Sequence, residues 1–324
     1  MKIGFLFSGY GSQYLGMGKE LYDNFRIVQE LFEEASNCLN INFVRLCFAS
    51  SEAELNKPEN AFVAIFLLQA SIVAVLREKK VFPDLVFGYE LGDYGALHAA
   101  LGITFPDALY LLTKYAQYYK NCLSNIDLHA VEIKGVSVAE IKKYCKQLDS
   151  AETLDISIIY DATTCVVTGS SEALNQLKED IDEFDPKVSL YDNTAGLYSP
   201  QMKTVIAQLK MYLEKVDFKD ISIPCHINIE SKSLLTSAEI KKHFFEQLGK
   251  PLSWHKRMHK MRELDIIIQI GPNTQLTEKV KNKYAETKEV IILNKLADFH
   301  ALQCILTSYK PLDSQKSEIK YGTI

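Results

Sequence analysis

Residues 81–101 constrain the fold more than any other part of the chain. A short apolar run predicts a buried strand, Gly88 and Gly92 predict a sharp turn, and residues 94–101 predict a helix. A strand, a turn with glycines two residues on either side of one central residue, and a helix form a nucleophile elbow, which presents the central side chain at the helix N-terminus. That central residue is ordinarily serine, and here it is Glu90.

Two segments resemble motifs of one enzyme family. Residues 88–97 are similar to the Gly-His-Ser-Leu-Gly-Glu-Tyr-Ala-Ala-Leu motif of malonyl-CoA:acyl carrier protein transacylases and polyketide-synthase acyltransferases. Residues 5–13, Phe-Leu-Phe-Ser-Gly-Tyr-Gly-Ser-Gln, resemble the Phe-Pro-Gly-Gln-Gly-Ser-Gln segment that opens this family. Because the two motifs stand at the expected separation, the chain is identified as a member of this acyltransferase family.

The resemblance implies an α/β fold in two parts. An α/β-hydrolase-like acyltransferase domain is expected from residues 1–127 plus 192–310, with a ferredoxin-like subdomain inserted at 128–191. The pattern of 128–191 itself predicts strand, helix, two strands, helix and strand, which is the ferredoxin-like order. Further helices are predicted at 19–39, 60–78 and 104–123, with Thr104 as an N-cap. Residues 311–324 are a polar tail without a pattern.

Composition and charge exclude several classes of function. The chain has 324 residues, 47% of them hydrophobic, which is enough for a full core. Its net charge of −5 and the lack of a Lys/Arg cluster argue against nucleic-acid binding. The longest apolar run, 61–76, is shorter than a membrane span, and no signal-peptide pattern opens the chain. We therefore expect a cytoplasmic protein that binds neither nucleic acid nor membranes.

The sequence gives no sign of a metal or a cofactor. Seven cysteines are scattered without a Cys-x-x-Cys pair, which is typical of free thiols. His255 and His259 have helical spacing, but the basic residues between them and the absence of an adjacent carboxylate favour a solvated helix face.

The catalytic positions of the family are changed in this chain. The resemblance implies a nucleophilic serine, a histidine base, oxyanion donors and an arginine that pairs with the malonyl carboxylate. Glu90 stands at the serine position, and Tyr198 stands at the histidine position of a segment resembling Pro-Phe-His-Ser-Pro-Leu-Met. Tyr115 falls at the arginine position, and Tyr10 replaces a glutamine of the first glycine loop. Tyrosine, with a reference pKa of about 10, is a proton donor rather than a ready base.

Other positions of the family persist. Asn228 fits a Pro-x-x-x-Asn pattern, and Gln247 fits Gln-Leu-x-x-Pro-x-x-Trp. Glu90 is therefore the candidate catalytic residue, and the candidate pocket consists of Tyr10, Tyr89, Leu91, Tyr115, Tyr198, Asn228 and Gln247. His98 lies about 12 Å along the helix from Glu90, too far to act on it. Cys225 and His226 could approach the pocket, but buried strand residues are the favoured interpretation.

Two functions remain open. The first is a non-catalytic acyltransferase homologue that binds a carrier or another partner, because enzymes without their triad retain only about 10³–10⁴-fold rate enhancement. The alternative is an acyl hydrolase acting on acyl carrier protein, or an altered acyltransferase, that uses Glu90. Burial would raise the pKa of Glu90 and the helix N-terminus would lower it, so the sequence leaves its charge open.

The resemblance also implies partners. It points to an acyl carrier protein, with acyl-CoA or another polyketide-synthase component as alternatives. The chain is similar to free-standing acyltransferase homologues of bacillaene-type trans-acyltransferase clusters, which implies a role in making an antibiotic polyketide.

Overall fold

Two five-stranded sheets organise the chain in the computed structural model, which describes residues 1–124, 127–148, 154–191, 198, 202–227, 233–272, 275–284 and 286–308. The first sheet has the order β10-β9-β1-β2-β7 and is parallel throughout. Its strands are β1 (Ile3–Phe7), β2 (Leu85–Gly88), β7 (Cys225–His226), β9 (Ile266–Ile270) and β10 (Glu289–Leu293). Strands β1, β2 and β9 are buried along their whole length, as expected for a parallel sheet covered on both faces.

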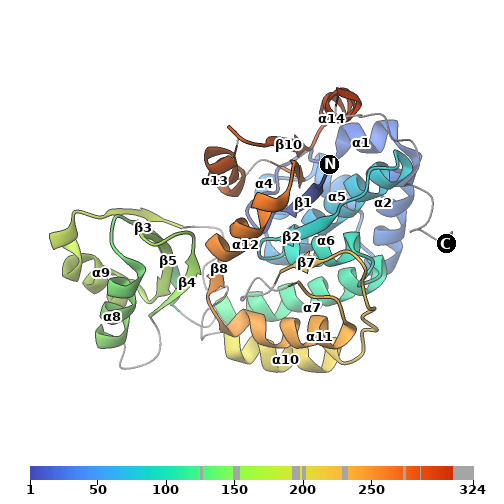
Figure 1. Cartoon of the computed structure of the whole chain (residues 1–324). Coiled ribbons are helices and arrows are strands. Elements are labelled where there is room, and N and C mark those ends of the chain that lie inside the picture. The colour runs from blue at the N-terminus through green and yellow to red at the C-terminus, as the bar shows by residue number, and fades with distance from the viewer. Residues whose placement is uncertain are drawn as a thin grey trace.

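The second sheet belongs to a smaller part of the fold, which lies to one side of the larger part (Figure 1). Its order is β6-β3-β5-β4-β8, formed by β3 (His129–Lys134), β4 (Asp155–Ile159), β5 (Thr164–Gly169), β6 (Lys187–Leu190) and β8 (Leu252–Ser253). Helices α8 (Val138–Leu148) and α9 (Ser171–Asp180) complete the ferredoxin-like order and pack on it through a separate core. The expected fold class is therefore confirmed, with β8 as an unforeseen edge strand from far along the chain.

The remaining helices build the larger part (Figure 1). They are α1 (Lys19–Asn24), α2 (Arg26–Leu39), α3 (Phe43–Ala49), α4 (Glu52–Leu55), α5 (Pro58–Glu78), α6 (Gly92–Ala99), α7 (Phe105–Leu123), α10 (Lys203–Leu213), α11 (Ser237–Glu246), α12 (Trp254–Lys260), α13 (Gln275–Tyr284) and α14 (Leu296–Ser308). As predicted, Thr104 caps α7, because its hydroxyl accepts a hydrogen bond from the Asp107 backbone N–H at 3.2 Å.

Some predicted boundaries are wrong. The helix expected over 19–39 is interrupted at Phe25, whose backbone is extended (φ −126°) and whose ring packs against Phe299 of α14. The elbow helix begins at Gly92, two residues early, and ends at Ala99, before Leu101 adopts a positive φ of 66°.

Helix α5 crosses the core of the larger part. It has 21 residues, so the expectation that this apolar stretch is too short for a membrane span is wrong. Among the described residues it is the one helix long and apolar enough to cross a membrane, and 83% of its most apolar window is buried inside the fold. Its contacts with α2, α6 and α7 account for that apolar character.

Candidate active site at the β2–α6 elbow

The backbone of the elbow has the tight geometry that the glycine spacing predicts. Glu90 lies between β2 and α6 with a φ of 55°, in the left-handed region that non-glycine residues rarely adopt. The Gly92 N–H donates to the Tyr89 carbonyl at 2.9 Å, and the Asp93 N–H donates to the Glu90 carbonyl at 3.1 Å. A side chain at Gly92 would collide with the Phe7 carbonyl at the end of β1, so this turn requires glycine there.

The Glu90 side chain is buried without hydrogen bonds of normal geometry. The residue is 2% exposed, and neither carboxyl oxygen has a hydrogen-bond partner among the described residues. Burial raises the pKa of Glu90 well above its usual range, although the neighbouring Tyr89 side chain and Tyr10 backbone lower it in part. Of the two opposing effects that the sequence leaves open, burial prevails, and the neutral carboxylic acid is favoured.

A second carboxyl group, three residues further on, has a different environment. Asp93 is fully buried and its Oδ1 lies 2.9 Å from Nη1 of Arg257, which is also fully buried. The same guanidinium donates to the Gly88 carbonyl at 2.5 Å and to the Ile227 carbonyl. Arg257 therefore ties the elbow, β7 and α12 together through charge-assisted hydrogen bonds.

The sequence does not reveal this pair; the solvated helix face predicted there concerns His255 and His259, and the structure confirms it for His259. His259 is exposed and His255 is partly exposed, but Arg257 shares the buried face of α12 with Trp254 and Met258. Its spacing of three residues from Trp254 was the available signal, because residues three apart on a helix lie on one face.

Three further polar side chains join Asp93. The Gln247 amide donates to Asp93 Oδ2 and, at 3.2 Å, to the hydroxyl of Tyr198. His243 Nε2 lies 3.4 Å from the same carboxylate oxygen. Burial lowers the pKa of His243 despite the carboxylate beside it, so this contact is a hydrogen bond of a neutral imidazole. Burial also raises the pKa of Tyr198 well above its usual range, which keeps its phenol protonated.

Aromatic rings surround the position where the resemblance places the arginine. Tyr115 is buried, and its ring meets that of Phe62 edge to face with centroids 5.2 Å apart. Phe62 meets Tyr10 in the same way on its other side. The hydroxyl of Tyr10 donates to the Asn56 carbonyl at 2.9 Å. Lys114, next to Tyr115, has its ammonium group 5.3 Å from the centroid of the Tyr212 ring.

Tyr89 connects the elbow to the smaller part of the fold. Its hydroxyl lies 2.7 Å from that of Tyr160 and 3.1 Å from that of Tyr191, and these two hydroxyls are 2.8 Å apart. Tyr160 and Tyr191 directly follow β4 and β6, so two strand ends of the second sheet meet the elbow. The sequence does not single out these two tyrosines, although each lies at the end of a predicted strand.

The remaining candidates are placed as follows. Leu91 is buried at the start of α6, and Asn228 lies outside the described residues. Among the described contacts, His98 makes no hydrogen bond with Glu90. Its Nδ1 lies 3.3 Å from the Ile103 carbonyl oxygen, and burial lowers the pKa of His98 to about 4. Cys225 and His226 are both buried in β7, which confirms their interpretation as strand residues.

Within the described ranges, no group of three His, Cys, Asp or Glu side chains is arranged to hold a metal ion.

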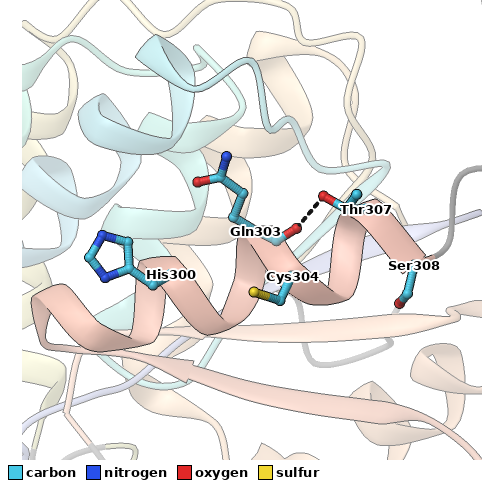
Figure 2. A pocket seen from close by; sticks show the side chains of 5 residues that line it. All are labelled: His300, Gln303, Cys304, Thr307 and Ser308. Atoms are coloured by element: carbon cyan, nitrogen blue, oxygen red, sulfur yellow. Dashed lines mark hydrogen bonds between the residues drawn. The ribbon is translucent and has the colours of Figure 1, made fainter.

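A surface depression lies apart from the elbow. An open depression of about 600 Å³ runs along α14 and is lined by His300, Gln303, Cys304, Thr307 and Ser308 (Figure 2). The Thr307 hydroxyl there donates to the Gln303 carbonyl of the same helix.

Comparisons with known proteins agree with this architecture. The profile of the acyl transferase domain family matches residues 4–301. A malonyl CoA-acyl carrier protein transacylase of Bacillus subtilis is 28% identical over 295 residues, which cover 90% of this chain and 93% of the relative.

Solved structures give the same result. The malonyl CoA-acyl carrier protein transacylase of Clostridium perfringens superimposes with a TM-score of 0.88 at 25% identity, covering 95% of this chain and 98% of that one. A malonyl-transacylase solved in complex with a type II polyketide-synthase acyl carrier protein has the same fold, with a TM-score of 0.88 at 24% identity, covering 94% of this chain and 100% of that one. The elbow is thus that of an acyltransferase, and the chain belongs to the acyl transferase domain family.

Proposed function

We propose that this chain is an acyltransferase homologue that binds an acyl carrier protein or another polyketide-synthase component without transferring malonyl groups. The observation that carries the proposal is Glu90, which stands at the elbow as a buried carboxyl group with a raised pKa. A protonated carboxylic acid is a poor nucleophile toward a thioester, and a mixed anhydride formed on it would be labile.

The groups around Glu90 do not supply the missing chemistry. Tyr198 has a raised pKa and is hydrogen-bonded by Gln247, so it is no base at neutral pH. The imidazole of His243 faces Asp93 rather than Glu90. Tyr115 presents a neutral buried phenol where a malonyl carboxylate would need a cation.

Support for the carrier as partner comes from the relatives. Their names describe transfer to acyl carrier protein, and one solved relative holds a polyketide-synthase carrier. Acyl-CoA and other polyketide-synthase components remain the alternatives. A cytoplasmic location and a role in making a bacillaene-type antibiotic polyketide belong to the same proposal, on the strength of the resemblance. The proposal also includes the domain bounds, which are 1–127 plus 192–310 for the larger domain and 128–191 for the subdomain, and the pocket residues named above.

The alternative function is hydrolysis of acyl groups from the carrier, with Glu90 as general base. The observation that favours it is that the two buried carboxyl oxygens have no hydrogen-bond partner among the described residues, so they are available to accept a proton from water. A water molecule activated there would attack the thioester directly, without a covalent intermediate.

The experiment incubates the protein with acetyl-, malonyl- and longer acyl-carrier proteins and follows the mass of each carrier over time. The malonyl transacylase of Bacillus subtilis serves as the positive control, and Glu90→Gln runs in parallel. We expect the carrier masses to change no faster than without protein. Loss of an acyl group that disappears in Glu90→Gln would establish the hydrolase instead.

A further inference from the structure

Glu90 has the shape of an acylated serine. In an acetylated serine, Cβ is followed by Oγ, then by a trigonal carbon that carries one oxygen and one methyl group. In glutamic acid, Cβ is followed by Cγ, then by the trigonal Cδ that carries Oε1 and Oε2. The two side chains have the same number of heavy atoms and the same branching, and both are uncharged when the acid is protonated.

A side chain of this length at the elbow reaches the glycine loop that follows β1. A methyl group at Gly9 would stand 2.7 Å from Glu90 Oε2 and 2.8 Å from its Cβ, so the side chain runs against the glycine loop that follows β1. That loop also presents the backbone of Tyr10 to the carboxyl group. At 2% exposure, the space is filled by the protein's own side chain.

We propose that Glu90 is a built-in mimic of the acylated elbow, which makes the site select a carrier whose arm ends in a free thiol over a carrier whose arm is acylated. This inference rests on the proposed function. An acyl transferase that works through an elbow ester meets two ligands in turn: an acyl donor when the elbow is free, and a thiol acceptor when the elbow is acylated. Because the Glu90 side chain permanently fills the elbow, the site corresponds only to the acylated state, which meets the thiol acceptor.

The selectivity follows from volume. An acylated arm has to place its thioester carbonyl beside the elbow, and the carboxyl group of Glu90 already occupies that space against Gly9. Overfilling a packed site is unfavourable, since the side chains must leave their preferred rotamers. A thiol-terminated arm is shorter by the whole acyl group and ends before this contact.

Glu90→Gln and Glu90→Ala separate shape from charge. Glutamine keeps the branched trigonal end of the side chain and is neutral at every pH, so we expect it to keep the preference. Alanine leaves the space beside Gly9 empty, and like glutamine it has to adopt the positive φ of 55° at this position. We expect the alanine variant to accept acylated arms. Thermal unfolding tests whether both variants fold, and Glu90→Ser replaces Glu90→Ala if the alanine variant does not fold.

The experiment measures binding of one acyl carrier protein, that of Bacillus subtilis, in its apo, free-thiol and acetylated forms by calorimetry. We expect the free-thiol form to bind at least about tenfold more tightly than the acetylated form in the native protein and in Glu90→Gln, and within about threefold in Glu90→Ala. Equal affinities in the native protein, or a preference that survives in Glu90→Ala, would overturn the inference.

A second pair of probes makes failure of the inference distinct from failure of the proposed function. Pantetheine and S-acetylpantetheine carry the arm without the carrier, and their binding is followed by ligand-observed NMR. Binding of the apo carrier without any preference between thiol and thioester refutes the mimic and leaves the carrier-binding function intact. A preference for pantetheine in a protein that binds no carrier supports the mimic and refutes the carrier-binding function.

Discussion

Arg257→Met is expected to lower the free energy of unfolding by about 3–5 kcal/mol, because it leaves the Asp93 carboxylate buried without a cation. The substitution also removes the donors to the Gly88 and Ile227 carbonyls, which fix the elbow against β7. Methionine fills a similar volume, so loss of charge rather than a cavity dominates the effect. Urea denaturation followed by circular dichroism gives the value.

Lys256→Met is the matched control for this prediction. Lys256 precedes Arg257 on α12 and is exposed, and we expect its replacement to change the free energy of unfolding by no more than about 0.5 kcal/mol. The double variant Asp93→Asn/Arg257→Met removes both charges and should recover part of the loss. An Arg257→Met protein as stable as Lys256→Met would mean that the buried pair does not hold the elbow.

Glu90→Gln is expected to stabilise the protein, and the gain should grow as the pH rises. Above the unfolded pKa of about 4.3, the unfolded chain releases the Glu90 proton while the native protein keeps it, because burial raises the native pKa. The stability of the native protein relative to the glutamine variant therefore falls with pH until the native pKa is reached. The difference should change by up to about 1.4 kcal/mol per pH unit in this window.

Denaturation curves at pH 5, 6, 7 and 8 for both proteins test this dependence, since all other titrating groups cancel in the difference. Glu34→Gln, at an exposed position on α2, serves as the control and should leave the stability within about 0.5 kcal/mol of the native protein. A difference between Glu90→Gln and the native protein that is constant with pH, or that shrinks as pH rises, would show that Glu90 is ionised in the native fold.

Glu90 and Asp93 illustrate how the fold gives two neighbouring acids different surroundings. Asp93 receives a guanidinium and an amide, from Arg257 and Gln247. Glu90 receives neither, and both of its oxygens are buried without hydrogen bonds in the described structure. Asp93 therefore helps to hold the elbow together, whereas Glu90 occupies the position of the nucleophile.

The sequence predicts the local features of this site well and its long-range contacts poorly. The glycine spacing around Glu90 fixes the elbow, because close backbone approach requires glycine there. The Asp93–Arg257 pair joins residues 164 positions apart, and no local pattern specifies such a contact. The break at Phe25 has a similar origin, since it depends on packing against a helix near the other end of the chain. The protonation of Glu90 depends on burial, which only the assembled fold determines.

Binding of an unacylated acyl carrier protein tests the central claim most directly. Calorimetric titration of the native protein with the apo carrier excludes any acyl chemistry, so it reports the partner surface alone. We expect saturable binding with a Kd of about 1 μM to 1 mM, typical of small transient interfaces, and an unchanged Kd in Glu90→Gln. If no binding is detected up to about 1 mM for apo and free-thiol carriers, while the Bacillus subtilis transacylase binds under the same conditions, the carrier-binding function is contradicted.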